Sequence, residues 1–113
     1  HAGATFHYLT ARPDAGDIVH QTVPEMERAD GIHDVAAKTV LAGAEDALRL
    51  LRAFEAHGQW KVERQRSAGR LFLNADFRPE HLRVIYQLFD DAMVREFLDG
   101  RLQPAAPSLI RQF

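Results

Sequence analysis

Two residues near the start of the chain, His7 and Asp14, are of types that can carry out acid–base chemistry together. A carboxylate beside an imidazole can orient the ring and stabilise its protonated form. The turn formers Pro13 and Gly16 flank Asp14, so a strand followed by a tight loop could bring the pair together. A second interpretation stays open, because a strand His is often only a packing or surface residue. An Asp in a Pro-Asp-x-Gly turn also often caps its own backbone.

The elements that must position this pair are two predicted strands and the loop between them. Residues 4–9 are rich in β-branched and aromatic side chains, which predicts a first strand. Residues 18–23, which stop at Pro24, predict a second strand. The intervening loop over 10–17 is long for a hairpin, and long loops often carry function.

A long helix is predicted after the strands, over roughly residues 32–57. Asp30 or Asp34 is a candidate N-cap, and Gly58 is a good C-terminal stop. We expect this helix to bury at least one face of the strand pair. Its apolar residues recur near the helical period at Val35, Leu41, Leu48, Leu51 and Phe54, with Ala37, Ala44 and Ala47.

Shorter elements are predicted in the second half of the chain. Residues 60–65 alternate like a strand, 67–69 form a turn, and 70–73 form a further short strand. A second helix opens at Pro79, a third spans 92–98 and ends at Gly100, and a loop or extended arm follows from Gln103. The sequence therefore predicts an α/β fold.

Composition excludes several classes of protein. The 113 residues are 46% hydrophobic and 27% charged, as in ordinary globular proteins, and the net charge of −2 disfavours nucleic-acid binding. No cysteine is present, which excludes disulfides and favours a cytoplasmic location, and no apolar run is long enough to cross a membrane. A local basic excess could meet an anionic ligand, but a charged strand edge is the favoured interpretation. This excess consists of Lys61, Arg64, Arg66 and Arg70.

The first two strands also carry a more specific pattern. Gly3-Ala-Thr5-Phe-His7, followed after a fixed gap by Asp14-Ala-Gly16-Asp-Ile18-Val-His-Gln21, resembles the signature of the folate-dependent formyltransferases. That family includes the glycinamide ribonucleotide, methionyl-tRNA and sugar-nucleotide N-formyltransferases. The specific resemblance covers residues 3–21, and a looser one reaches about residue 99. It implies that residues 1–100 are the C-terminal part of a larger three-layer catalytic domain and that 101–113 are a tail.

The resemblance also implies a reaction and roles for residues. A formyl group would move from 10-formyltetrahydrofolate, the co-substrate, to an amine, for which a sugar nucleotide or another small amine is preferred. Asp14 matches the Asp that holds the catalytic His and orders a water, and His7 matches the strand His that supports this Asp. Gly16 and Ala15 would lie against the folate, Gly16 through a positive φ or a close approach. Thr5 and Gln21 would satisfy neighbouring backbone groups.

The family's Asn-x-His motif does not occur in this sequence, whose single Asn is Asn74. Because the chain begins at His1 and enters a strand almost at once, we expect either preceding residues or a partner chain to supply the missing half. Two alternatives remain, namely a non-catalytic interaction module, which could form a homo-oligomer, and a formyltetrahydrofolate hydrolase. The other histidines are interpreted as structural, with His20 facing solvent or the far side of the sheet. No metal site is predicted, because the adjacent His33 and Asp34 point in different directions on a helix.

Overall fold

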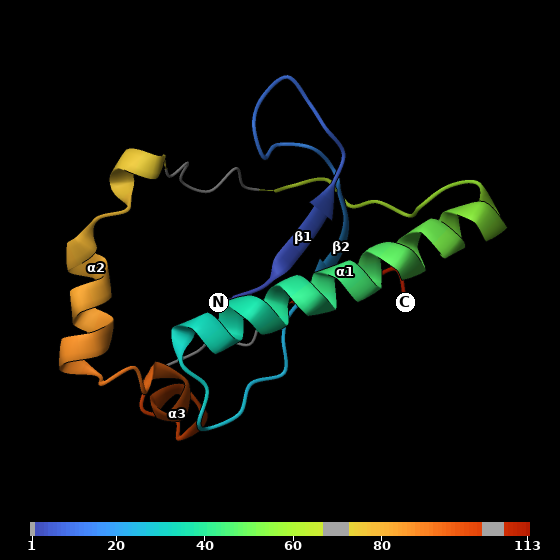
Figure 1. Ribbon diagram of the computed structural model, residues 1–113. Helices are drawn as coiled ribbons and strands as arrows, with labels where there is room; N and C mark the ends of the chain where they lie inside the picture. The colour runs from blue at the N-terminus through green and yellow to red at the C-terminus, as the bar shows by residue number, and fades with distance from the viewer. Residues whose placement is uncertain (1, 67–72, 103–107) are drawn as a thin grey trace.

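The computed structural model describes residues 2–66, 73–102 and 108–113 and shows a mixed arrangement of helices and strands (Figure 1). A two-stranded antiparallel sheet lies against one long helix, and several short helical segments form an arm beside them. The predicted α/β character is confirmed in this mixed content. None of the helices in the described parts of the chain is long and apolar enough to cross a membrane.

The sheet is a hairpin of β1 (Ala4–His7) and β2 (Ile18–Thr22). Ala4 pairs with Thr22 and Phe6 with His20, and the register shifts between Phe6 and His7. β1 is shorter than predicted, because the chain leaves the ladder at Tyr8 and turns into the loop. β2 ends at Thr22, one residue before the predicted end. The Tyr8 amide donates to the Asp17 carbonyl at 3.0 Å, which closes the base of the loop.

The helix α1 (Ile32–His57) has the bounds that the sequence predicts. The N-cap is Gly31, so the prediction of Asp30 or Asp34 at this position is wrong. Asp34 lies within the first turn, where its carboxylate accepts the Gly31 N–H at 2.8 Å. Asp30 instead accepts the Glu27 N–H at 2.8 Å and pairs with Lys38 at 2.7 Å. Gly58 ends the helix with φ +71°, a left-handed conformation that glycine adopts at little cost.

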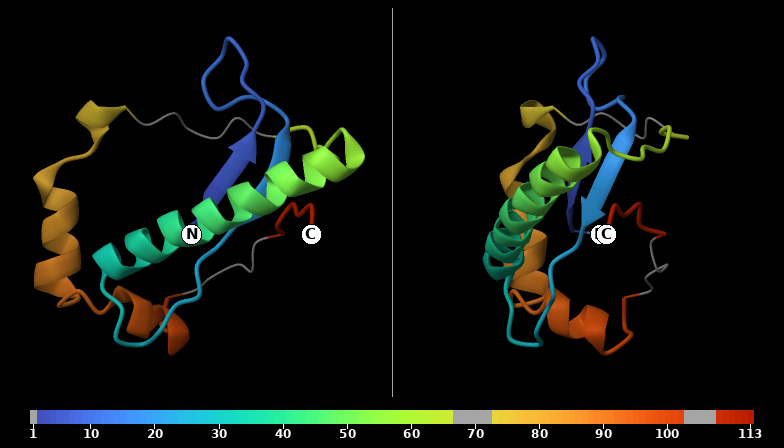
Figure 2. Two further views of the ribbon diagram at one scale, coloured as in Figure 1. Left: turned by 45° about the vertical axis from the view of Figure 1, so that its right-hand side comes forward. Right: turned by 90° about the vertical axis from the view of Figure 1, so that its right-hand side faces the viewer.

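One face of α1 packs across the hairpin, as predicted (Figure 2). The residues that α1 buries are Val35, Gly43, Asp46 and Leu50. Val35 is therefore the one member of the predicted apolar set that is fully buried. Leu41, Leu48 and Leu51 instead remain 65%, 58% and 61% exposed. The helical period was correct, but the period did not reveal which face turns towards the sheet.

The free edge of β2 is covered by two segments that come later in the chain. Ile18 and Glu63 exchange backbone hydrogen bonds of 2.7 and 2.9 Å, and the Gln21 N–H donates to the Ile110 carbonyl at 2.8 Å. The strand predicted at 60–65 is therefore wrong, because the pairing is a single bridge at Glu63. The predicted turn at 67–69 and most of the predicted strand at 70–73 lie outside the described residues.

The arm contains four short helical segments. These are η1 (Asn74–Asp76), α2 (Pro79–Arg83), η2 (Val84–Leu88) and α3 (Met93–Leu98). The predicted starts at Pro79 and near 92 are confirmed, and Gly100 follows α3 with φ +75°. Asp91 joins the arm to the start of α1, since its carboxylate accepts the Ile32 N–H at 2.9 Å.

Gly43 offers a test of the contact between helix and sheet. A Cβ added there would lie 3.5 Å from the Ala4 Cβ, an ordinary contact. Gly43→Ala is therefore expected to raise the free energy of unfolding by about 0.5–1 kcal/mol, because alanine favours helix and restricts the unfolded chain. Urea unfolding measures the change. The control Gly58→Ala should instead destabilise by about 1 kcal/mol, because φ is positive there. Destabilisation by Gly43→Ala would show a closer approach of β1 to α1.

Candidate functional site

The hairpin loop brings His7 and Asp14 together. His7 lies at the end of β1, and the loop returns Asp14 towards it, so that His7 Nε2 is 3.6 Å from Asp14 Oδ1. Asp14 has φ +52°, in the left-handed region that Asp tolerates better than most residues. Its side chain is 78% exposed and that of His7 is 22% exposed. The Asp14 carboxylate is thus exposed to solvent, and the His7 imidazole is partly buried beside it. The loop that carries Asp14 is at the top of Figure 1.

The hydrogen bonds of His7 determine how this pair can act. His7 Nδ1 lies 2.9 Å from the Tyr8 carbonyl, which can only accept, so Nδ1 carries a proton. In neutral His7 the unprotonated Nε2 would therefore face the Asp14 carboxylate. The separation of 3.6 Å is longer than a hydrogen bond and suits an ion pair with a protonated ring. Asp14 consequently keeps most of its accepting capacity for groups outside the pair.

Gly16 is buried beneath the loop, where it lies against the backbone of Tyr8. A Cβ built on Gly16 would clash with the carbonyl oxygen of Tyr8, so no other side chain fits there. Of the two predicted reasons for a glycine, close approach is therefore the correct one, but its partner is the chain itself. The positive φ belongs to Asp14 instead. The neighbouring Ala15 is half-buried, and binding of folate by Gly16 and Ala15 stays a prediction.

Gly16→Ala is expected to distort the loop, because its methyl group cannot fit against Tyr8. We expect a loss of about 1–3 kcal/mol in the free energy of unfolding, as for other overpacked sites. Urea unfolding gives this loss, and amide chemical shifts should place the change in residues 7–18. The matched control is Ala15→Gly, which removes a half-buried methyl group and should cost under about 1 kcal/mol. Equal stability of Gly16→Ala and the native protein would contradict the described packing.

The structure also shows a buried polar cluster that the sequence did not predict. His20 and Thr22 alternate along β2 and both point at Asp46 on α1. His20 Nε2 lies 3.0 Å from Asp46 Oδ2, which also accepts from the Thr22 hydroxyl. The prediction that His20 faces solvent or the far side is wrong, since His20 is 0% exposed beneath the helix. The sequence contained one signal for this cluster, because Asp46 lies on the side of the helix opposite Leu41 and Leu48.

The tail determines which tautomer of a neutral His20 fits this cluster. The Gln112 N–H donates to His20 Nδ1 at 3.1 Å, so the proton of a neutral ring lies on Nε2 and is donated to Asp46. Burial opposes the ionisation of Asp46, but the hydrogen bonds from Thr22 and His20 outweigh it and hold the pKa of Asp46 below its usual value. The Phe113 ring lies 4.5 Å from the His20 ring, centre to centre. The cluster therefore stabilises the fold and offers no access to a substrate.

Two further structural predictions concern the strand residues Thr5 and Gln21. Gln21 Oε1 accepts the Ile110 N–H at 3.2 Å, which satisfies a backbone donor as the sequence predicts. Gln21 Nε2 lies 3.5 Å from the Thr5 hydroxyl. Thr5 therefore contacts the side chain of Gln21. Because Gln21 also binds the backbone of Ile110, these two side chains link both strands to the tail.

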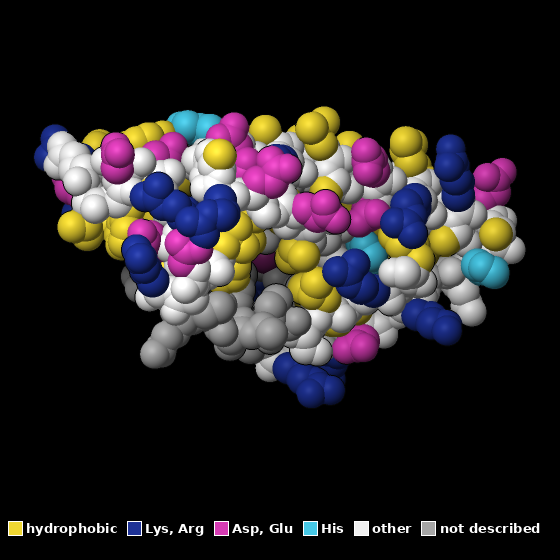
Figure 3. Space-filling model, turned by 90° about the horizontal axis from the view of Figure 1, so that it is seen from below, with side chains coloured by type: hydrophobic (Ala, Val, Ile, Leu, Met, Phe, Trp, Pro, Cys, Tyr) yellow, Lys and Arg dark blue, Asp and Glu magenta, His cyan; other side chains and the backbone are white. Residues whose placement is uncertain are grey.

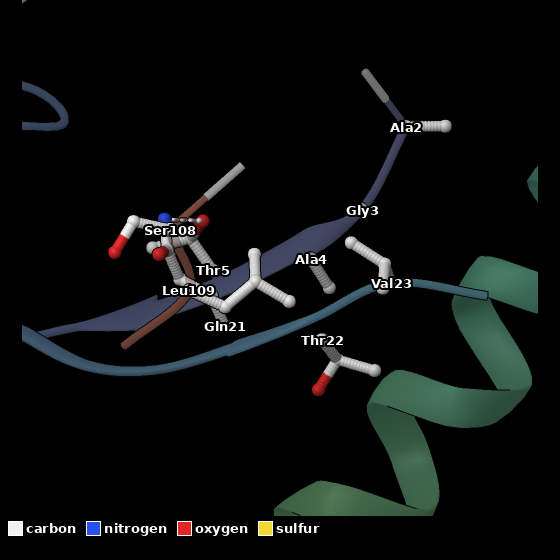
Figure 4. Close-up of a pocket in the computed structure, with 9 residues that line it drawn as sticks. All are labelled: Ala2, Gly3, Ala4, Thr5, Gln21, Thr22, Val23, Ser108 and Leu109. Carbon is white, nitrogen blue, oxygen red and sulfur yellow. Dashed lines mark hydrogen bonds between the residues drawn. The ribbon is translucent and has the colours of Figure 1, made fainter. Parts of the chain in front are cut away.

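A shallow hollow lies between the hairpin and the tail (Figure 4). Its volume is about 320 Å³, and residues 2–5 and 21–23 face Ser108 and Leu109 across it. None of His7, Asp14 and Gly16 lines it, so the hollow is separate from the candidate site. The basic residues Lys61, Arg64 and Arg66 are exposed, and Arg70 is outside the described residues. Among the described residues, no three His, Asp or Glu side chains converge as metal ligands would.

Comparisons with family models, with curated proteins and with solved structures found no match to this chain. The formyltransferase signature over residues 3–21 therefore stays a prediction from the sequence. The same holds for the roles of Asp14 and His7.

Proposed function

We propose that this chain is part of the catalytic domain of an N-formyltransferase, which moves a formyl group from 10-formyltetrahydrofolate to an amine. One observation carries the proposal. Asp14 lies on an exposed loop with its carboxylate accessible, and a histidine that is fixed by its own backbone contact lies beside it. An exposed carboxylate beside a histidine can take part in a proton relay.

The proposed reaction forms no covalent bond between the protein and the substrate. The amine nitrogen attacks the formyl carbon, the new C–N bond forms, and the bond from carbon to N10 of the folate breaks. The amine loses one proton and N10 gains one, so a base and a relay must be near the reacting atoms. An exposed carboxylate such as Asp14 can accept a hydrogen bond from a water or from an imidazole that carries this proton. His7 acts on Asp14 and not on the substrate, as a positioning residue.

The proposal needs groups that this sequence does not contain. An Asn and a His that stabilise the oxyanion would come from elsewhere in the natural protein or from a partner chain, within a larger three-layer domain. The exposed side of Asp14 is where they would approach. The acceptor that we favour is a sugar nucleotide or another small amine, and the location that we favour is the cytoplasm.

The test is formyl transfer by the natural protein that contains this sequence. Folate labelled in the formyl group is supplied with an amino sugar nucleotide, with other small amines, or with no amine. We expect amine-dependent release of tetrahydrofolate together with label in the amine. Release that is independent of amine would favour the hydrolase, in which water is the acceptor. Absence of both turnover and folate binding would contradict the proposal.

The second candidate is a non-catalytic assembly module, and the open shape of the chain favours it. The radius of gyration is 16.2 Å, against about 13 Å for a compact domain of this length. Concentration-dependent mass in light scattering, without folate binding, would support this candidate. Tight folate binding by the chain would contradict it.

A further inference from the structure

The outer face of α1 is apolar although it faces away from the sheet. Val40, Leu41, Leu48 and Leu51 are each more than half exposed, at 71%, 65%, 58% and 61%. Hydrophobic side chains protrude along the upper edge of Figure 3, where α1 runs when the molecule is seen from below. A helix that is apolar on two opposite faces is normally buried on both. We therefore expect another surface to cover this face of α1.

The spacing on this face is that of a coiled-coil seam. Residues 37, 41, 44, 48 and 51 are separated by four, three, four and three positions, which is the heptad spacing. Small and large side chains alternate over the first four, as Ala37, Leu41, Ala44 and Leu48. A matching helix must therefore offer a small residue opposite each leucine.

We propose that α1 pairs with α1 of a second copy of this chain in an antiparallel dimer. In the register that sets Leu41 against Ala44 of the second copy, Leu48 lies against Ala37 of the second copy. The two-fold axis repeats both pairs, so all four central layers join a large side chain to a small one. A parallel pair would instead stack leucine on leucine and alanine on alanine, which leaves gaps at the alanine layers.

Charges beside the seam select the same register. Arg52 comes next to Asp34 of the second copy, and the symmetry repeats this contact at the other end. Lys38 comes next to Glu45 of the second copy, in addition to its pairs with Asp30 and Glu27 in its own chain. A shift of the register by one heptad would set Lys38 against Arg52 and Glu45 against Glu45, which are like charges. Charge and shape thus agree on one arrangement, which is independent of the proposed formyl transfer.

The first test is the mass of the natural protein by sedimentation over about 1–500 µM, a range that suits the modest area of a two-helix seam. We expect a reversible monomer–dimer equilibrium. Leu48→Glu should raise the dissociation constant at least 10-fold, because the carboxylate would face Ala37 of the second copy. The control Leu88→Glu changes a leucine that is 73% exposed on η2 and should have no effect. Arg52→Glu provides a second variant on the polar flank and should weaken the dimer as well.

A mass that stays monomeric over this range would overturn the proposal, as would a dimer that Leu48→Glu and Arg52→Glu both leave unchanged. Orientation is tested by disulfides, since the chain has no cysteine of its own. Mixing the single variants Ala37→Cys and Leu48→Cys should give a mixed disulfide under mild oxidation, while neither variant should cross-link alone. Cross-linking of each variant with itself would show a parallel pair and overturn the antiparallel one.

Discussion

Replacing Asp14 by Asn in the natural protein is expected to leave the fold intact and to lower formyl transfer by about 100-fold or more. The fold should survive because the Asp14 side chain is 78% exposed and its ion pair with His7 is long. Asn also tolerates the left-handed conformation at φ +52°. Activity should fall because the amide has no negative charge with which to hold a protonated imidazole or to relay a proton. Steady-state turnover with 10-formyltetrahydrofolate measures the effect.

The matched control is Asp17→Asn, which makes the same change of charge three residues further along the same loop. Asp17 contributes its backbone carbonyl to Tyr8, and this contact survives the substitution. Its turnover should stay within about two-fold of the native value. If Asp14→Asn also lowers turnover by less than a few-fold, Asp14 has no part in the mechanism.

Replacing Asp46 by Ala is expected to lower the free energy of unfolding by about 3 kcal/mol, because two buried donors lose their acceptor. His20 Nε2 lies 3.0 Å from Asp46 Oδ2, and the Thr22 hydroxyl also donates to this oxygen. His20 and Thr22 are buried, so water cannot easily replace the carboxylate. Asp46→Asn keeps one acceptor oxygen and should cost less than Asp46→Ala. Urea unfolding of the native protein and both variants measures these differences.

The cost of Asp46→Ala should also depend on pH. The pKa of Asp46 in the folded protein is depressed, so the unfolded chain takes up the proton at a higher pH than the folded protein does. The stabilisation by the carboxylate is therefore complete above its ordinary pKa, near 4, and is lost as the pH falls through the depressed value. The gap between the native protein and Asp46→Ala should narrow in acid. A gap that stays constant down to about pH 2 would contradict this role.

Local structure was accessible from the sequence wherever neighbours along the chain decide it. The bounds of α1 follow from its apolar period and from the stop at Gly58, and α2 follows from Pro79 in a first turn. The turn residues around Asp14 also indicated a loop that could return it to His7. The strand predicted at 60–65 failed because a strand depends on a partner, and the partner edge of β2 accepts a single bridge at Glu63.

The amino-acid sequence by itself determined that the fold mixes helices and strands, and it determined the long helix and the hairpin. These features depend on residue spacing, turn residues and helix caps within a few positions along the chain. Only the tertiary structure decided that α1 turns Asp46 and Leu50 inward and leaves Leu48 outside. Only the tertiary structure placed His20 beneath that helix, against an acid 26 positions away. The physical reason is that periodicity fixes which residues share a face, whereas the surface packed against the helix decides which face is buried.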